Sequence, residues 1–210
     1  MKKILILITF ILSLNAIEIK QLPLDFGEER ILLTKEYIKK SYGFEVNEIN
    51  IVPKIIVIHH TAIDNLQEAY ERFKPEILTN DRKDIQKGGS LNVSAHFFVD
   101  FDGTIYSLMP ETYMARHVIG LNFSSIGIEN IGGNKKPLTK AQLEANIELV
   151  KYLKDKYKTI EYLIGHYEYT KFENHPLFLE KDKNYRTIKQ DPSKDFMESL
   201  REKFPDLKSI

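Results

Sequence analysis

Two histidines and one aspartate in this sequence have the side chains that a hydrolytic metal site needs. His59 follows the β-branched apolar run 55–58, and His166 follows a second apolar run, 160–164. Together with Asp191 they would leave a fourth tetrahedral position open for water. The gaps between the three residues are long, and a single histidine of this kind is more often structural. Spacing alone therefore leaves both interpretations open.

Composition narrows the chemistry further. The sequence has no cysteine, so a metal would have to be held by histidine and carboxylate rather than by thiolate. Acidic and basic side chains are equal in number, which gives a formal net charge of zero without a long run of one sign. This pattern argues against a nucleic-acid partner, which requires a concentrated basic surface.

Strands and helices that alternate along the chain would position these side chains. Strands are predicted at 55–58, 95–99, 104–108, 126–131 and 160–164. Helices are predicted at 28–41, 66–78, 139–153 and 192–204. The fold class is therefore α/β, a mixed β-sheet flanked by helices in a single domain. Active sites of such sheets lie beyond the carboxyl ends of the strands, which is where His59 and His166 are predicted.

Short sequence signals at the ends of some of these elements support their predicted boundaries. Thr139 and Gln142 have the spacing of a capping box, which predicts the start of a helix. Gly43 is a typical helix stop after the stretch 28–41. The sequence 100–103, Asp-Phe-Asp-Gly, predicts a hairpin turn between two strands, and the polar stretch 81–92 predicts a loop.

The first sixteen residues have the layout of a secretory signal peptide. Lys2 and Lys3 precede an apolar core, 4–14, and Ala16 offers a small residue for cleavage. The core is shorter than the roughly 20 residues of a membrane-spanning helix; a buried N-terminal strand or helix is the alternative. We expect a signal peptide at 1–16, an N-terminal extension at 17–54 and a catalytic domain at 55–205. Without a cysteine to lipidate, the exported protein is expected to be soluble in the periplasm.

Four short segments occur in an order that resembles a known enzyme family. They are Val57–Ala62 (VIHHTA), Asn122–Glu129 (NFSSIGIE), Gly165–His166 and Lys189–Pro192 (KQDP). In this order they resemble the type 2 N-acetylmuramoyl-L-alanine amidases, a family that also includes phage amidase lysozymes and animal peptidoglycan-recognition proteins. The similarity covers about 55–196, and it implies a peptidoglycan-recognition-protein-like fold.

The resemblance implies a reaction and a set of roles. The reaction is zinc-dependent hydrolysis of the amide bond between N-acetylmuramic acid and L-alanine, in peptidoglycan or muropeptides. His59, His166 and Asp191 match the zinc ligands, Glu129 matches the residue that moves protons, and Lys189 matches a lysine near the metal. The alternation of an extended segment agrees, because it turns Lys189 and Asp191 to one side. Glu129, inside a predicted strand, would be a costly buried charge unless a zinc-bound water partners it; an outward-facing strand position is the alternative.

The resemblance extends to the substrate groove and also has its limits. His117 and Asn122 match positions that line the groove, and His96 follows the same strand pattern as a groove residue. His60 is interpreted as a residue that supports a metal ligand or packs in the core, and His175 as an exposed loop residue. Phage members carry a catalytic tyrosine where this chain has Ala95, so the branch that uses an acidic residue is the better template. The stretch 167–188 is longer than expected and would form a rim or lid.

Two other functions compete with this reading. The segment 97–105 resembles the nucleophile strand of haloacid-dehalogenase-type phosphatases, in which one aspartate attacks phosphorus. A hairpin turn explains the same residues more simply, and no strand leads into the acidic pair Asp191 and Asp195 that would complete such a site. The other competitor is a peptidoglycan-binding module that does not cut. Loss of a metal ligand would favour that module, but all three candidate ligands are present.

Overall fold

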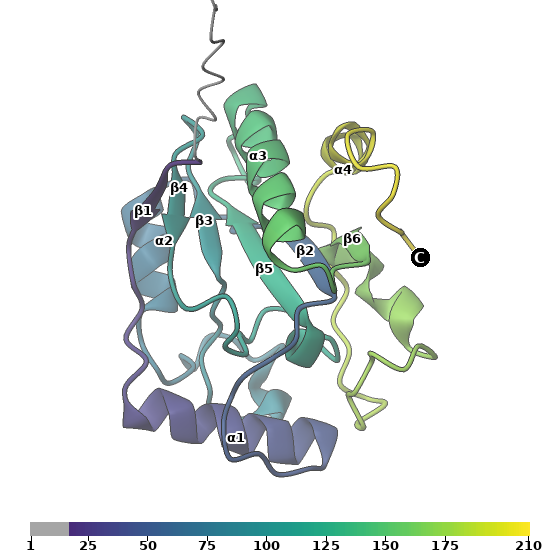
Figure 1. Ribbon diagram of the computed structural model, residues 1–210. Helices are drawn as coiled ribbons and strands as arrows, with labels where there is room; N and C mark the ends of the chain where they lie inside the picture. Colours follow the sequence, from purple (N-terminus) through teal and green to yellow (C-terminus); the bar gives the residue numbers. More distant parts are fainter. Residues whose placement is uncertain (1–16) are drawn as a thin grey trace, which may run out of the picture.

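A six-stranded mixed β-sheet forms the centre of the computed structural model, which describes residues 17–210 (Figure 1). The predicted signal peptide lies outside the described residues. The strands are β1 (Ile19–Gln21), β2 (Ile55–His60), β3 (Phe97–Val99), β4 (Ile105–Ser107), β5 (Ser125–Asn130) and β6 (Tyr162–Gly165). Their order across the sheet is β1-β4-β3-β5-β2-β6, and only the β3–β4 pair is antiparallel. The expected mixed α/β sheet is therefore confirmed.

Helices cover the sheet and connect its strands. The α-helices are α1 (Glu28–Tyr42), α2 (Leu66–Phe73), α3 (Lys140–Lys156) and α4 (Lys194–Arg201), and the 3₁₀ helices are η1 (Gln86–Gly88), η2 (Asn122–Ser124) and η3 (His166–Phe172). Within residues 17–210, no helix combines the length and the apolar character that crossing a membrane requires. Residues 17–54 contribute β1 and α1 to the same body, and β1 is hydrogen-bonded along the edge of the sheet.

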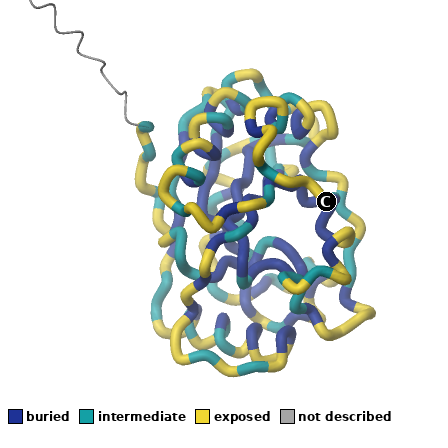
Figure 2. The backbone as a smooth tube through the Cα atoms, turned by 45° about the vertical axis from the view of Figure 1, so that its right-hand side comes forward, coloured by how far each residue is buried: buried dark blue, intermediate teal, exposed yellow. Residues whose placement is uncertain are grey.

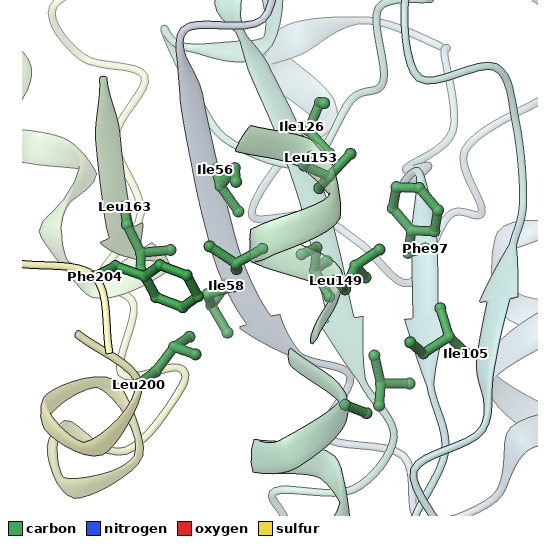
Figure 3. Packing of buried hydrophobic residues seen from close by; sticks show 14 of the residues in the cluster. Ile56, Ile58, Phe97, Ile105, Ile126, Leu149, Leu153, Leu163, Leu200 and Phe204 are labelled. Atoms are coloured by element: carbon green, nitrogen blue, oxygen red, sulfur yellow. The ribbon is translucent and has the colours of Figure 1, made fainter. Parts of the chain in front are cut away.

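The central strand β2 separates two apolar layers. Ile56 and Ile58 face a cluster built with α3 and α4, in which the side chains of Leu149 and Leu200 take part (Figure 3). Ile55 and Val57 alternate with them and pack into the opposite layer. Burial of such a side chain typically contributes about 1.5–3 kcal/mol, so this strand is fixed on both faces. In Figure 2 the buried segments lie mostly inside the molecule and the exposed segments around its outside.

Most of the local signals produce the expected elements. The side chain of Thr139 accepts from the N–H of Gln142, and the side chain of Gln142 accepts from the N–H of Thr139, so the capping box at the start of α3 is formed. Gly43 ends α1 in the left-handed region at φ 75°, where glycine carries no steric penalty. The hairpin between β3 and β4 turns at Asp100–Gly103, where the Gly103 N–H donates to the Asp100 carbonyl.

Two differences from the sequence prediction have a clear physical cause. Helix α2 ends at Phe73 rather than near Leu78, because Pro75 has no N–H with which to continue the hydrogen-bond ladder. Strand β1 was not predicted at all. It is three residues long and pairs only with β4, so the apolar pattern that identifies a strand is too short to recognise there.

Candidate metal centre and active site

The strand register brings the first two functional side chains together. In the parallel pair of β2 and β5, His59 lies directly opposite Glu129, and both sit near the carboxyl ends of their strands. Strand β6 pairs with β2 on its other side, with Gly165 opposite Ile58, so His166 follows at the same edge of the sheet. Three separate strands therefore deliver their side chains to one place, as expected for an α/β sheet.

Asp191 completes a compact cluster at this edge. Nδ1 of His59 lies 2.9 Å from Nδ1 of His166. Oδ2 of Asp191 lies 3.0 Å from Nδ1 of His166 and 3.4 Å from Nδ1 of His59. Among the described residues, these three form the one group of histidine and acidic side chains whose ligand atoms converge closely enough to hold a metal ion.

The spacing of the three atoms fits a tetrahedral metal ion. Ligand atoms about 2.0–2.1 Å from a zinc ion are separated by about 3.3 Å along a tetrahedron's edge, which is close to the distances in this cluster. Burial, and then repulsion by His166, lowers the pKa of His59 to about 4, so its ring is neutral and able to ligate. Burial alone would raise the pKa of Asp191, but His166 and His59 hold it well below its usual range. His59 and Asp191 are thus in their ligating forms.

Glu129 lies beside the cluster without joining it. Its Oε1 is 4.0 Å from Nδ1 of His59, and only 8 % of the residue is exposed. Its Oε2 is buried without a hydrogen-bond partner, which is costly unless a further group sits there. Burial, and then the charge of Asp191, raises the pKa of Glu129 to about 8, against the opposing effect of Lys189. A dication at the cluster would favour the ionised carboxylate and would supply the missing positive charge.

A pocket of about 360 Å³ opens onto the cluster. Glu129, His166, Lys189 and Asp191 all line it. Exposure alternates along the last wall segment: Thr187, Lys189 and Asp191 are partly buried and line the pocket, whereas Ile188 is 95 % exposed. Lys189 and Asp191 therefore share one side of the segment, the placement that their two-residue spacing predicted.

Hydrogen bonds from a side chain and from the main chain hold this last segment, which has no regular secondary structure. The hydroxyl of Tyr169 accepts from the N–H of Thr187 at 2.8 Å and donates to its carbonyl at 2.8 Å. The N–H of Tyr167 donates to the carbonyl of Asp191 at 3.1 Å. These contacts tie the segment to η3, the helix that begins with His166. The stretch 167–188 therefore supplies part of the pocket wall, through Tyr185 and Thr187, and also anchors it.

The three predicted groove residues have different positions. His96 is fully buried and does not line the pocket: its Nδ1 accepts from the N–H of Gly127 at 3.0 Å, and its Nε2 lies 2.9 Å from the carbonyl of Tyr113. We therefore correct the interpretation of His96 as a groove residue; it anchors β5 instead. His117 and Asn122 do reach the pocket lining.

Two other histidines complete the comparison with the sequence. His60 lies on the pocket lining with its ring against Gly133, where a Cβ atom would come within 2.2 Å of the ring. His175 is partly buried, with Nε2 3.2 Å from the hydroxyl of Tyr162, so the expectation of a freely exposed residue was wrong.

Sequence reasoning missed Arg116, which organises one wall of the pocket. Its buried guanidinium donates to the carbonyls of Ile85, Gly89 and Leu91, and also to the hydroxyl of Tyr185 at 3.1 Å. It thereby joins the loop before β3 to the stretch 167–188. No spacing rule connects these positions, and a buried arginine has no periodic signal in a sequence.

The comparison with known proteins decides the family. The family model for N-acetylmuramoyl-L-alanine amidases matches residues 50–194. The chain belongs to this family. It is therefore an amidase that acts on peptidoglycan. This family assignment excludes the phosphatase alternative. Asp100 and Asp102, on which that alternative rested, accept hydrogen bonds from main-chain N–H groups within the β3–β4 turn. No curated protein sequence matches the chain.

Solved structures show the same fold. N-acetylmuramoyl-L-alanine amidase LysC from Clostridium intestinale is similar with a TM-score of 0.55 and 23 % identity over 92 % of this chain and 100 % of that one. An AmpD structure gives a TM-score of 0.56 at 20 % identity, over 89 % and 94 % of the two chains. Peptidoglycan recognition protein LE, solved with tracheal cytotoxin, gives 0.52 at 19 % identity, over 83 % and 94 %. The peptidoglycan-recognition-protein-like fold of the amidase is thus confirmed.

Proposed function

We propose that this amidase uses zinc, held by His59, His166 and Asp191, to hydrolyse the bond between N-acetylmuramic acid and L-alanine. The observation that carries the proposal is the convergence of three ligand atoms, 2.9–3.4 Å apart, beside a pocket that His166 and Asp191 line. The family match supports the amide bond, and the donor set of two imidazoles and one carboxylate supports zinc. When bound, zinc polarises the carbonyl under attack and lowers the pKa of water to about 7.

Glu129 is the group that moves protons in this proposal. The attacking water must lose a proton, and the carboxylate beside the cluster accepts it. The same carboxyl group then donates that proton to the departing nitrogen of L-alanine, because an unprotonated nitrogen is a poor leaving group. Its position in the ladder opposite His59 keeps its Oε1 4.0 Å from Nδ1 of His59, next to the cluster.

Lys189 stabilises the negative charge that develops on the carbonyl oxygen. Its side chain lines the pocket on the same side of the segment as Asp191, which supports a role for its ammonium group beside the reacting carbonyl. Positive charge aimed at an oxyanion acts mainly in the transition state, because the ground-state carbonyl carries little charge. Lys189 is therefore assigned to catalysis rather than to holding the metal.

The substrate in this proposal is peptidoglycan or a muropeptide derived from it, and the enzyme works outside the cytoplasm. The basic start, the apolar core and Ala16 support export with cleavage near Ile17. Peptidoglycan recognition protein LE binds tracheal cytotoxin, a monomeric diaminopimelic-acid-type peptidoglycan, which supports a muropeptide ligand on this fold. Cell fractionation with N-terminal sequencing is expected to find mature protein in the periplasm; full-length protein in the cytosol would contradict export.

Product analysis tests the reaction. Purified amidase is incubated with isolated sacculi, and the soluble products are separated and weighed by mass spectrometry. Free stem peptides that begin with L-alanine are expected, together with glycan that has lost them. A chelator should stop their release, and added zinc should restore it. Products cut at a glycosidic or peptide bond, or release that a chelator does not affect, would contradict the proposal.

A further inference from the structure

A chain of hydrogen bonds runs from His59 away from the metal cluster to a main-chain carbonyl. Nε2 of His59 lies 2.9 Å from Nδ1 of His117, and Nε2 of His117 lies 3.1 Å from Oγ of Ser125. The Ser125 hydroxyl lies 2.9 Å from the carbonyl oxygen of Leu121. Each ring nitrogen on this path has one partner, and the path ends on a group that can only accept.

The end of the path determines which atoms carry protons. The Leu121 carbonyl accepts the single proton of the Ser125 hydroxyl, so the hydroxyl oxygen accepts from Nε2–H of His117. Nδ1 of the neutral His117 ring is then an acceptor, and His59 donates to it from Nε2. Nδ1 of His59 consequently keeps its lone pair, and this is the atom that faces the metal cluster.

The position of His117 is built into the protein. Oδ1 of Asn122 accepts from the N–H groups of His117 and Val118 at 2.9 and 2.8 Å, and Nδ2 of Asn122 donates to the hydroxyl of Tyr37 at 3.2 Å. The His117 ring also lies against Gly127, where a Cβ atom would come within 2.7 Å of it. The ring is therefore held in place from both sides before any ligand arrives.

We propose that His117 is a positioning residue that, through Ser125, fixes the tautomer of His59 and so sets the affinity of the cluster for its metal. The inference rests on the proposed zinc site. It assigns His117 a role other than substrate contact: both of its ring nitrogens are already paired with protein groups, so neither is free for a substrate. Partners that fix the second nitrogen of a ligating histidine typically contribute about 10–100-fold in metal affinity.

Two substitutions at one position test this role. His117→Phe keeps a ring of similar size but removes the acceptor, whereas His117→Asn places an amide oxygen near the position of Nδ1. Zinc dissociation constants are measured without substrate, by competition with a chromophoric chelator. His117→Phe should bind zinc about 10–100-fold more weakly than wild type, and His117→Asn should recover most of that loss. Wild-type affinity in His117→Phe, or equal losses in both variants, would overturn the proposal.

The tautomer itself can be read in the metal-free protein. Imidazole ¹⁵N chemical shifts should show His59 protonated at Nε2 in wild type and distributed between both nitrogens in His117→Phe. Ser125→Ala provides a second route if the Phe variant does not fold, since it removes the acceptor that orients His117; it should shift the same signals. Unchanged His59 tautomers in a folded variant would refute the inference.

These readouts separate the inference from the proposed function. A wild-type protein that binds no zinc would remove the zinc mechanism, and the nitrogen shifts would still test whether His117 orients His59. Normal zinc binding and amide hydrolysis in His117→Phe, with unchanged shifts, would refute the positioning role and leave the mechanism intact. Near-UV circular dichroism of each metal-free variant verifies the fold.

Discussion

The two halves of the active site are held by different means. His59 and Glu129 lie opposite each other on β2 and β5, where the register of a parallel ladder fixes their separation. Lys189 and Asp191 lie on a segment without regular structure, which depends on a few hydrogen bonds such as those of the Tyr169 hydroxyl. The strand-held half is set by main-chain pairing that most substitutions leave untouched. In the loop-held half, the loss of a single side-chain contact can loosen the segment.

The largest loss of activity is expected from a change to the metal site, to which both halves contribute a ligand. His166→Ala removes one of three ligands, so the protein should lose its zinc and its amidase activity should fall below detection. Metal analysis of the purified variant, together with release of stem peptides, measures both. His175→Ala, at a histidine outside the pocket lining, is the control and should retain both. Full metal and full rate in His166→Ala would show that the cluster is misassigned.

Next comes a substitution in the strand-held half that spares the metal. Glu129→Gln keeps the shape of the side chain but cannot accept a proton, so turnover should fall by about 10²–10⁴-fold. Zinc content should stay near wild type because the ligands are unchanged. Single-turnover rates on zinc-loaded protein provide the measurement. A near-normal rate would mean that another group moves the proton.

In the loop-held half, Lys189→Ala should reduce turnover by about 10²–10³-fold while the protein keeps its zinc. The loss should appear in kcat more than in KM, because the oxyanion forms only after attack. Steady-state kinetics on a soluble muropeptide separates the two constants. A change confined to KM would instead make Lys189 a substrate-binding residue.

Acid should destabilise the whole protein through His96, whose ring accepts a hydrogen bond from Gly127 of β5. Burial lowers the pKa of His96 to about 4, below the value near 6.5 expected in the unfolded chain. The unfolded state therefore takes up the proton first, so stability is complete above about pH 6.5 and decreases as the pH falls towards 4. His96 contributes about 3 kcal/mol to this loss of unfolding free energy. Urea denaturation from pH 7 to 4 should show a shallower decline for His96→Gln than for wild type; identical slopes would contradict this account.

The smallest expected effect tests the anchoring of the loop-held half. Tyr169→Phe removes the hydroxyl that bridges the N–H and carbonyl of Thr187 and should destabilise the protein by about 1–3 kcal/mol. It should also weaken zinc binding, since the segment carries Asp191. Tyr70→Phe is a matched control: it removes a hydroxyl that donates to Pro23, so its zinc affinity should not change. Equal zinc affinities in the two variants would show that the segment needs no such anchor.

The same division explains what could be predicted from the sequence. Two β-branched or apolar runs that end in His59 and His166 are visible in the sequence, and the sheet brings such strand ends to one edge. Asp191 and Lys189 follow no regular element, so only their resemblance to a family motif located them. Arg116 and Tyr185 were invisible, because their contact joins residues 69 positions apart and leaves no periodic trace. His96 was misplaced because the sequence does not show which face of a short strand meets the pocket.

Strand β1 has a consequence for how far the N-terminus can be trimmed. Residues Ile19–Gln21 occupy the hydrogen-bonding edge of β4, only a few residues after the expected cleavage position. A protease that removed them would expose that edge as a template for pairing with another molecule. Residues Ile19–Gln21 thus keep the edge of β4 from pairing with a second molecule.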